Sequence, residues 1–341
     1  MGQSNLTLIL TPGEPGGVGA EITLKAWETL RNTAQLSFAI LGDEAHITAQ
    51  AKLAGLPCQT RRIEHVSQIT ETFSSALPVL HRPLPAAVTV GQFSPATAHW
   101  VTGCITEAVD LCLSNAASAM VTNPIQKEAL YAAGFKYQGH TDFLAALCHE
   151  RGLPAQDVMM LVGGGLRTVP LTVHIALKDV PAALTQATII TQAEVVHHAL
   201  QARFGIAAPR IAITGLNPHS GENGAMGREE IDIIIPALDQ LRNEGIAVMG
   251  PLSADTAFHA EARTAYDAIL CMYHDQALIP VKTLDFHGGI NVSLGLPFIR
   301  TSPDHGTALG IAGRHIANPK SLIAAIKLAA AMASARTNAR A

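Results

Sequence analysis

The sequence predicts an α/β protein with largely parallel sheets, divided into two domains. Short apolar segments alternate with longer helical segments along the chain, which is the pattern of parallel strands connected by helices. The 341 residues exceed the usual size of one domain. Because 48% of the residues are hydrophobic and 15% are charged, the chain has enough apolar material for a large core.

The apolar segments that are bounded by turn residues are predicted to form strands. Between two of them, the run from Gly163 to Gly165 predicts a tight hairpin. The predicted strands are 6–10, 36–41, 119–122, 158–162, 169–174, 210–214 and 268–273, with a further pair at 290–293 and 297–300.

Segments of helical character connect these strands. Pro181 suits the first turn of a helix, and Gly205 and Gly245 suit helix ends. No linker, internal repeat or low-complexity segment is evident, so the domain boundary should be a crossover between packed lobes. The predicted helices are 20–30, 96–114, 181–204, 229–243 and 319–335.

Composition and charge exclude several classes of partner. The net charge is −4 with histidine neutral, and lysine and arginine are scattered along the chain, so no nucleic-acid partner is expected. The longest apolar runs are too short to span a membrane. The N-terminal segment lacks the basic start of a signal peptide, and Leu6 breaks the myristoylation pattern. We therefore expect a cytoplasmic protein.

The cysteines indicate neither disulfide bonds nor a cysteine-based metal site. Their number is odd, and no CxxC pattern occurs. Because free cysteines are usually interior, we expect buried thiols at Cys58, Cys104, Cys112, Cys148 and Cys271.

Three histidines follow three of the predicted strands. His174 ends one strand, His219 follows another through an Asn-Pro turn, and His274 directly follows a third. Ligands of α/β proteins bind beyond the carboxyl ends of the strands, and three imidazoles can hold a divalent ion while leaving a position for substrate. The residues alone leave two interpretations open, a metal site or three unrelated histidines with local hydrogen bonds. Asp255 and Asp275 could orient the rings or take a proton.

Two turns could bind phosphate. The glycine-rich segment 12–22 lacks the GxGxxG pattern of dinucleotide-binding turns, so it can equally be a tight turn without a ligand. Thr141 is predicted to cap a helix whose free N–H groups would attract an anion, with His140 beside it. An ordinary helix cap is the alternative for this second turn.

Three further polar side chains lie among apolar residues and glycines. Lys282, Asn291 and Arg300 occupy the segment 280–319, where a cation requires either a salt bridge or an anionic ligand. Together with the helix start at Thr141, they predict a substrate that carries phosphate or carboxylate.

A resemblance to a known family is carried by five segments, "TPGEPGGVG", "GHT", "GLNPHSGE", "MYHDQ" and "VKTL…GGINVSLGLPFIRTSPDHGTA". They resemble the 4-hydroxythreonine-4-phosphate dehydrogenase family of pyridoxal-phosphate biosynthesis, which is related to isocitrate and isopropylmalate dehydrogenases. The resemblance runs essentially end to end and is most specific at residues 215–308. The segment "GGVGAEI" looks like the N-terminal glycine turn of that group, and "DHGTALGIAGRHIANP" is similar to its loop for the adenosine part of the nicotinamide cofactor.

The resemblance implies two α/β/α lobes of the isocitrate/isopropylmalate-dehydrogenase-like type, with the active-site cleft between them. One lobe would comprise residues 1–125 and 285–341 and carry the cofactor loop. The other, residues 126–284, would carry the metal ligands and the dimer contacts. The family also implies a homodimer with the active site at the interface.

The resemblance also assigns roles to single residues. One departure from the family pattern is Asp142, where glutamate would be expected, and the shorter carboxylate is still compatible with a helix N-terminus. The implied metal ligands are His174, His219 and His274. The implied substrate-binding residues are His140, Thr141, Lys282, Asn291 and Arg300. The implied cofactor-binding residues are Gly306, Ile316 and Asn318.

The implied reaction is the oxidation of 4-phosphooxy-L-threonine by NAD or NADP with one divalent ion, zinc, magnesium or cobalt. The product, 2-amino-3-oxo-4-phosphooxybutanoate, would lose CO₂ to give 3-amino-2-oxopropyl phosphate. Lys282, Asp255 or Asp275 would take the proton, and the sequence does not choose among them.

Three alternatives remain. A related branch that acts on D-threonate or D-erythronate 4-phosphate shares the same ligand set. An NAD-independent metallohydrolase or lyase could use the three histidines, with Asp275 activating water. An acyltransferase is conceivable because phosphate acetyltransferases share a related two-lobed fold. The C-terminal loop favours the dehydrogenase over the last two.

Overall fold

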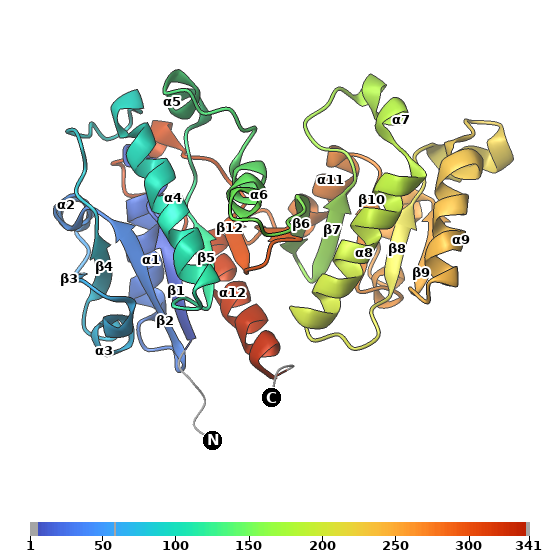
Figure 1. The fold of residues 1–341 in the computed structure, drawn as a ribbon. Helices are drawn as coiled ribbons and strands as arrows, with labels where there is room; N and C mark the ends of the chain where they lie inside the picture. Colours follow the sequence, from blue (N-terminus) through green and yellow to red (C-terminus); the bar gives the residue numbers. More distant parts are fainter. Residues whose placement is uncertain (1–5, 58, 339–341) are drawn as a thin grey trace. The chain divides into compact units, whose positions relative to one another are not determined.

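The computed structural model describes residues 6–57 and 59–338, and Figure 1 traces the chain from blue to red. Internal contacts divide the chain into two compact units. Unit 1 consists of Met1–Ala155 and Leu296–Ser334, and unit 2 consists of Gln156–Gly295 and Ala335–Ala341. Residues 1–5 and Cys58, which enter the expectations about the N-terminus and the thiols, lie outside the described residues.

Unit 1 is a parallel sheet covered by helices (Figure 1). Its strand order is β3-β4-β2-β1-β5-β12. The strands are β1 (Leu6–Thr11), β2 (Leu36–Gly42), β3 (Thr60–Ile63), β4 (Leu77–His81), β5 (Ala119–Thr122) and β12 (Arg300–Pro303). The helices are α1 (Gly19–Leu30), α2 (Glu44–Leu53), α3 (Ile69–Phe73), α4 (Ala98–Leu113), α5 (Lys127–Ala132), α6 (His140–Glu150) and most of α12 (Lys320–Asn338).

The central strands of unit 1 are buried on both faces. Every residue of β2 and β5 is buried, as expected for parallel strands that helices cover on each side. Trp27 of α1 is fully buried, and its indole Nε1 donates a hydrogen bond to the Phe73 carbonyl at 2.8 Å. The carboxyl ends of β1, β5 and β12 therefore belong to a closely packed scaffold.

Unit 2 has a mixed sheet in the order β11-β6-β7-β10-β8-β9. Strands β11, β6 and β7 pair antiparallel, whereas β7, β10, β8 and β9 pair parallel. The strands are β6 (Val158–Gly163), β7 (Leu166–Pro170), β8 (Ile211–Thr214), β9 (Val248–Leu252), β10 (Ala268–Cys271) and β11 (Ile290–Leu294). The helices are α7 (Val180–Ala183), α8 (Gln186–Ala202), a π-helical turn (Glu230–Ile234) that continues into α9 (Ile235–Asn243), α10 (Ala254–Ala257) and α11 (His274–Leu284).

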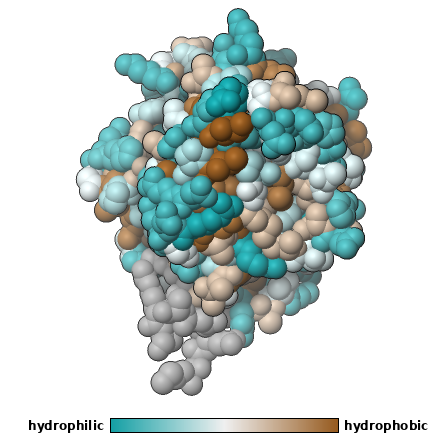
Figure 2. Space-filling model, turned by 90° about the vertical axis from the view of Figure 1, so that its right-hand side faces the viewer, coloured by the Kyte–Doolittle hydropathy of each residue, from teal (hydrophilic) through white to brown (hydrophobic). Residues whose placement is uncertain are grey.

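The surface on the α9 side of unit 2 is a mixture of hydrophilic and hydrophobic residues. Figure 2 views that side and shows a few hydrophobic side chains gathered in a strip among polar ones. Within the described residues, no helix is both long and apolar enough to cross a membrane.

The division between the units falls later in the chain than the predicted boundaries at 125 and 285. Helix α6 belongs to unit 1 because Leu144, Leu147 and Cys148 enter the buried cluster that also contains α4. Strand β11 belongs to unit 2 because it pairs with β6 over its whole length. Both assignments depend on packing between distant segments, which sequence periodicity does not reveal.

Most predicted strands of the central sheets are confirmed within one or two residues at each end. The predicted hairpin is also confirmed, because Gly163 pairs with Leu166 and the two loop glycines, Gly164 and Gly165, have φ of +57° and +77°. Four of the expected buried thiols are confirmed as free and buried, namely Cys104, Cys112, Cys148 and Cys271.

Several predicted element bounds are wrong. The strand expected at 169–174 ends at Pro170, because the chain bends away before His174, which has a left-handed φ of +53°. The strand expected at 297–300 instead begins at Arg300. The helix expected at 181–204 is two helices, since the Thr185 hydroxyl caps α8 by accepting from the Thr188 N–H at 3.1 Å.

Other elements were not predicted. Strands β3, β4 and β9 are short, and two central residues of β3 are exposed arginines that carry no apolar signal. Helix α11 was not among the predicted helices either. It contains Pro280, which usually argues against a helix interior.

Candidate active site

Gln276 joins the carboxyl ends of β8 and β10. Its buried side-chain Oε1 accepts hydrogen bonds from the Met272 N–H at 2.6 Å and the Thr214 hydroxyl at 2.8 Å, while Nε2 donates to the Gly215 carbonyl at 2.9 Å. Because Gln276 lies in the first turn of α11, these bonds determine where that helix begins. They thereby place His274, the first residue of α11, at the end of β10.

His274 and His174 form a pair in unit 2. Their ring centroids lie 5.8 Å apart, and His274 Nδ1 lies 2.7 Å from the Asp275 carboxylate. That contact orients the ring and leaves Nε2 as the ring nitrogen that could bind a metal ion. The two histidines line a cavity of about 250 Å³ together with Thr172, Val180, Tyr273 and Asp275.

His219 lies five residues beyond β8, in the irregular segment Pro218–Gly224. It neighbours Asp255 at the start of α10. A 2.6 Å hydrogen bond from the Ser253 hydroxyl and, to a smaller extent, the charge of the His219 imidazole lower the pKa of Asp255 below its usual value. Each of the two predicted carboxylates thus lies beside one of the predicted histidine ligands.

The donor set suits a divalent ion, although the described chain brings the three histidines only partly together. In residues 6–57 and 59–338, no three His, Cys, Asp or Glu side chains lie close enough to hold a metal ion. The pair His174–His274 and the separate His219 nevertheless supply imidazole nitrogen atoms, which are common ligands of divalent ions. The carboxylate on His274 Nδ1 is the typical outer partner of a metal-binding imidazole.

Unit 1 contains the predicted arginine and histidine of the substrate site. Arg300 begins β12 and is 3% exposed, and its Nε and Nη2 donate to the Thr122 hydroxyl at 3.1 and 2.6 Å. His140 is the first residue of α6. Burial, together with the nearby charges of Arg300 and Lys127, holds the pKa of His140 well below its usual value. The imidazole is therefore neutral at physiological pH.

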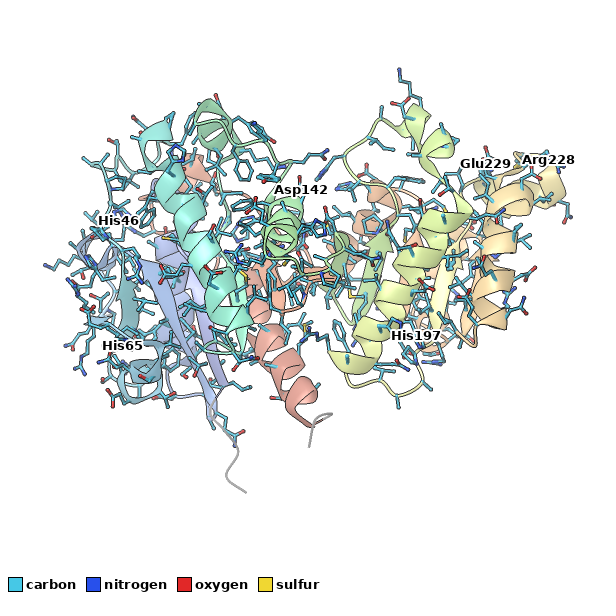
Figure 3. All side chains as sticks on the ribbon, in the orientation of Figure 1. His46, His65, Asp142, His197, Arg228 and Glu229 are labelled. Carbon is cyan, nitrogen blue, oxygen red and sulfur yellow. The ribbon has the colours of Figure 1, made fainter. Side chains whose placement is uncertain are left out.

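The prediction that Thr141 caps α6 is wrong. The N-cap is Gly139, without a side-chain hydrogen bond, and Thr141 is the second helical residue. Instead, the Asp142 carboxylate accepts a hydrogen bond from the Gln138 N–H, and Figure 3 labels Asp142 at this helix. Glycine at the cap leaves the first N–H groups of α6 without the usual side-chain acceptor.

Lys127 is a cation at this position that the sequence interpretation missed. Its Nζ lies 3.8 Å from the point where a Cβ on Gly139 would stand, and it contributes to the lowered pKa of His140. Lys127 begins α5, shortly after β5. The rule that ligands bind beyond strand ends could have found it in the segment "NPIQK".

The two remaining predicted substrate residues lie in unit 2. Asn291 is in β11, and its Oδ1 is buried without a hydrogen-bond partner among the described atoms. Lys282 lies in the last turn of α11, with Nζ 5.5 Å from the ring centroid of Phe286. The Phe286 side chain is 70% exposed. A cation–π contact between Lys282 and such an exposed ring is of modest strength.

The N-terminal glycine turn and the C-terminal loop lie against each other within unit 1. The Val18 N–H donates to the Thr307 carbonyl at 3.1 Å, and a Cβ on Gly17 would lie 2.9 Å from that oxygen. Glu21 accepts from the Ala317 N–H at 2.9 Å, and Lys25 donates to the Ala317 carbonyl at 2.9 Å. This contact leaves the three predicted cofactor residues exposed on the loop, namely Gly306, Ile316 and Asn318.

The fold defines a class of protein. The chain is similar to isocitrate dehydrogenase from Methylococcus capsulatus, with a TM-score of 0.50 and 12% identity over 98% of this chain and 88% of that chain. At this identity the likeness shows the fold alone. The protein therefore has the isocitrate-dehydrogenase-like α/β fold.

Closer comparisons identify the family. Residues 34–329 match the family model described as pyridoxal phosphate biosynthetic protein PdxA, and the chain belongs to this family. It is 50% identical over 331 residues to 4-hydroxythreonine-4-phosphate dehydrogenase of Caulobacter vibrioides, covering 96% of this chain and 98% of that protein. A crystal structure of 4-hydroxythreonine-4-phosphate dehydrogenase from Klebsiella pneumoniae matches with a TM-score of 0.85 and 36% identity, covering 96% of this chain and 99% of that chain.

The chain is accordingly an oxidoreductase of pyridoxal phosphate biosynthesis. As a dehydrogenase it uses a nucleotide cofactor. These statements confirm the family, the fold class and the enzyme class that the sequence motifs predict.

Proposed function

We propose that this chain oxidises 4-phosphooxy-L-threonine to 2-amino-3-oxo-4-phosphooxybutanoate, with NAD or NADP as the oxidant and a divalent ion at the site. Loss of CO₂ then gives 3-amino-2-oxopropyl phosphate. The observation that carries the proposal is the 50% identity, over nearly the full length, to a 4-hydroxythreonine-4-phosphate dehydrogenase. The anchored C-terminal loop supports a nucleotide site at Gly306, Ile316 and Asn318.

The proposed metal ligands are His174, His219 and His274. When bound, a zinc, magnesium or cobalt ion would lower the pKa of the substrate hydroxyl, and a nicotinamide cofactor would supply the hydride acceptor. The protein's own contribution is orientation. Asp275 holds the His274 ring, and Asp255 lies beside His219.

The proton of the reacting hydroxyl is assigned to Asp255 or Asp275 rather than to Lys282. A general base must lie within hydrogen-bond reach of the proton that it takes. The two carboxylates lie beside the proposed ligands, whereas Lys282 lies eight residues beyond His274 in α11, about 12 Å along the helix axis. Lys282 is therefore better placed to bind an anionic group of the substrate.

Binding of the phosphate and carboxylate is assigned to the residues that concentrate positive charge and hydrogen-bond donors. In unit 1, Arg300 is held rigidly by Thr122, and the neutral His140 can donate one hydrogen bond. A planar guanidinium suits two oxygen atoms of one anionic group. The full proposed set is His140, Thr141, Lys282, Asn291 and Arg300.

A homodimer that completes the active site is part of the proposal. Large apolar side chains near the proposed site residues of unit 2 are exposed, namely Leu177 (66%), Ile279 (62%) and Phe286 (70%). Exposed apolar side chains that cluster near a functional site often mark an interface. A partner subunit also provides a way to complete the set of three histidines. A cytoplasmic location remains a prediction from the sequence.

The test is a kinetic comparison with metal-loaded enzyme and NAD⁺, followed by NADH absorbance. We expect 4-phosphooxy-L-threonine to give a higher kcat/KM than D-threonate 4-phosphate or D-erythronate 4-phosphate. A higher kcat/KM for either sugar-acid phosphate would instead assign the enzyme to the related branch that acts on D-threonate or D-erythronate 4-phosphate. Turnover without NADH formation would point to the metallohydrolase or lyase, and no turnover of any phosphorylated four-carbon hydroxy acid would refute the dehydrogenase proposal.

A further inference from the structure

Glu230 holds the backbone that leads to His219. The Glu230 side chain is 2% exposed, and its Oε1 accepts hydrogen bonds from the N–H groups of Leu216 and Asn217, both at 2.8 Å. Its Oε2 accepts from Asn217 Nδ2 at 2.9 Å. One buried carboxylate therefore accepts hydrogen bonds from three donor groups on Leu216 and Asn217, the two residues before Pro218 and His219.

The same carboxylate also contacts the chain after His219. A Cβ on Gly221 would lie 2.6 Å from Glu230 Oε2, and one on Gly215 would lie 3.0 Å from Oε1. Gly221 also has a φ of +80°, in the left-handed region that favours glycine. The segments on both sides of His219 are thus packed directly against Glu230.

The backbone between these contacts is strained. His219 and Ser220 have φ of +50° and +51°, values that cost energy for residues with a side chain. A long hydrogen bond, from the Ser220 hydroxyl to the Pro251 carbonyl at 3.3 Å, also restrains this stretch. A strained segment needs surrounding contacts to hold one conformation, and Glu230 accepts three hydrogen bonds from the residues that lead into it.

The location of Glu230 is itself unusual. It begins the π-helical turn that precedes α9, and such turns occur often at functional sites. Charge-assisted hydrogen bonds to backbone N–H groups are stronger than neutral ones. The carboxylate can therefore set the position of the loop more closely than an apolar contact would.

We propose that Glu230 is a positioning residue for metal binding, which holds the His219 imidazole in place through the loop 215–221. This inference rests on the proposed role of His219 as a metal ligand. It adds a residue that touches neither the metal nor the substrate and that sequence motifs did not single out.

The test is a Co²⁺ titration of chelator-treated protein, followed by the visible absorbance of the bound ion. We expect Glu230→Ala to weaken Co²⁺ binding by about tenfold or more, in the range typical for the loss of outer partners of metal ligands. We also expect the absorbance spectrum to change, because His219 would no longer be held in one orientation. Glu230→Gln retains an oxygen acceptor for the two backbone N–H groups and should recover part of the affinity.

The matched control is Glu229→Gln. Glu229, labelled beside Arg228 in Figure 3, accepts from the same Asn217 Nδ2 at 2.7 Å, whereas the backbone N–H groups of Leu216 and Asn217 donate to Glu230. Its variant should bind Co²⁺ like the wild type. The melting temperatures of all variants distinguish a general loss of stability from a change at the metal site. If Glu230→Ala does not fold, the Co²⁺ affinity of Glu230→Gln provides the test.

The outcomes are distinguishable. Wild-type affinity and spectrum in both folded Glu230 variants would overturn the inference while leaving the proposed function intact. Equal weakening by Glu229→Gln would overturn it too, because the effect would then come from Asn217. Failure of the wild type to bind Co²⁺ would refute the metal site and this inference with it. The proposed oxidation of the substrate would still be tested separately, by NADH formation with the wild-type enzyme.

Discussion

The Gln276 side-chain Oε1 lies 2.8 Å from the Thr214 hydroxyl, and this hydrogen bond ties the start of α11 to the end of β8. The strand that precedes His219 and the helix that begins with His274 are therefore joined through one buried amide. Three polar groups depend on that amide, and none of the bonded atoms faces open solvent.

Replacement of Gln276 should test the importance of this network for stability. Gln276→Leu would leave the Met272 N–H and the Gly215 carbonyl unsatisfied. Since each buried unsatisfied group costs about 1–3 kcal/mol, we expect the free energy of unfolding, measured by urea denaturation, to fall by about 2–6 kcal/mol. Thr214→Val removes one hydroxyl alone and should cost about 1 kcal/mol. Equal stability of Gln276→Leu and the wild type would contradict the structural role.

His219→Ala should abolish metal retention and turnover while leaving the fold largely intact, because His219 is exposed. Bound metal can be measured by atomic emission after dialysis, and the fold by circular dichroism. The control is His197→Ala on α8, labelled in Figure 3. Full activity of His219→Ala without bound metal would remove His219 from the ligand set.

Mixing two inactive variants should test the proposed dimer. If the His219 and His274 of one site come from different subunits, reassorted dimers of His219→Ala and His274→Ala contain one intact site in each mixed dimer. Activity should then recover to about a quarter of the wild-type value for random exchange in a two-fold dimer. If both histidines of a site come from one subunit, mixing restores nothing. The monomer–dimer state is checked by light scattering.

Arg300→Ala should mainly raise KM for the phosphorylated substrate, by at least about tenfold, because the change would remove the proposed bidentate contact with an anionic group. Lys127→Met should raise KM by a smaller factor, since one point charge is lost. Lys136→Met, a lysine in the segment between α5 and α6, is the control. An unchanged KM for Arg300→Ala would exclude that residue from substrate binding.

The lowered pKa of His140 should make stability depend on pH. In the unfolded chain this imidazole takes up a proton near pH 6.5, whereas in the folded protein it stays neutral to a lower pH. The unfolded state therefore binds more protons as the pH falls below about 6.5, and the folded state loses up to about 1.4 kcal/mol per pH unit until the folded pKa is reached. His140→Gln should flatten the acid side of the stability profile.

The control for the pH profile is His65→Gln. His65 is an exposed residue at the start of a short helical turn and is labelled in Figure 3. Its replacement should leave the acid slope unchanged. The free energy of unfolding would be measured by urea denaturation between pH 5 and 8. Parallel profiles for the wild type and His140→Gln would show that burial of His140 does not control acid stability.

Sequence patterns were sufficient to predict the class of fold, the family and the types of residue at the candidate site. Strands such as β2 and β5 could be predicted because parallel strands covered on both faces are continuous apolar runs. The hairpin at Gly164 could be predicted because its two left-handed loop residues require glycine. The family followed from motifs that run through most of the chain.

Which side chains become neighbours depends on how distant segments of the chain pack together. The neighbours of His174, the buried setting of His140 and the attachment of Lys25 to the C-terminal loop join segments that are far apart in sequence. The cap of α6 went to Gly139 rather than Thr141 because a hydroxyl at a helix start is a local preference that the surrounding chain can override. Local patterns report propensity and burial, whereas Lys127 and Glu230 acquire their roles from contacts that form only when distant segments pack together.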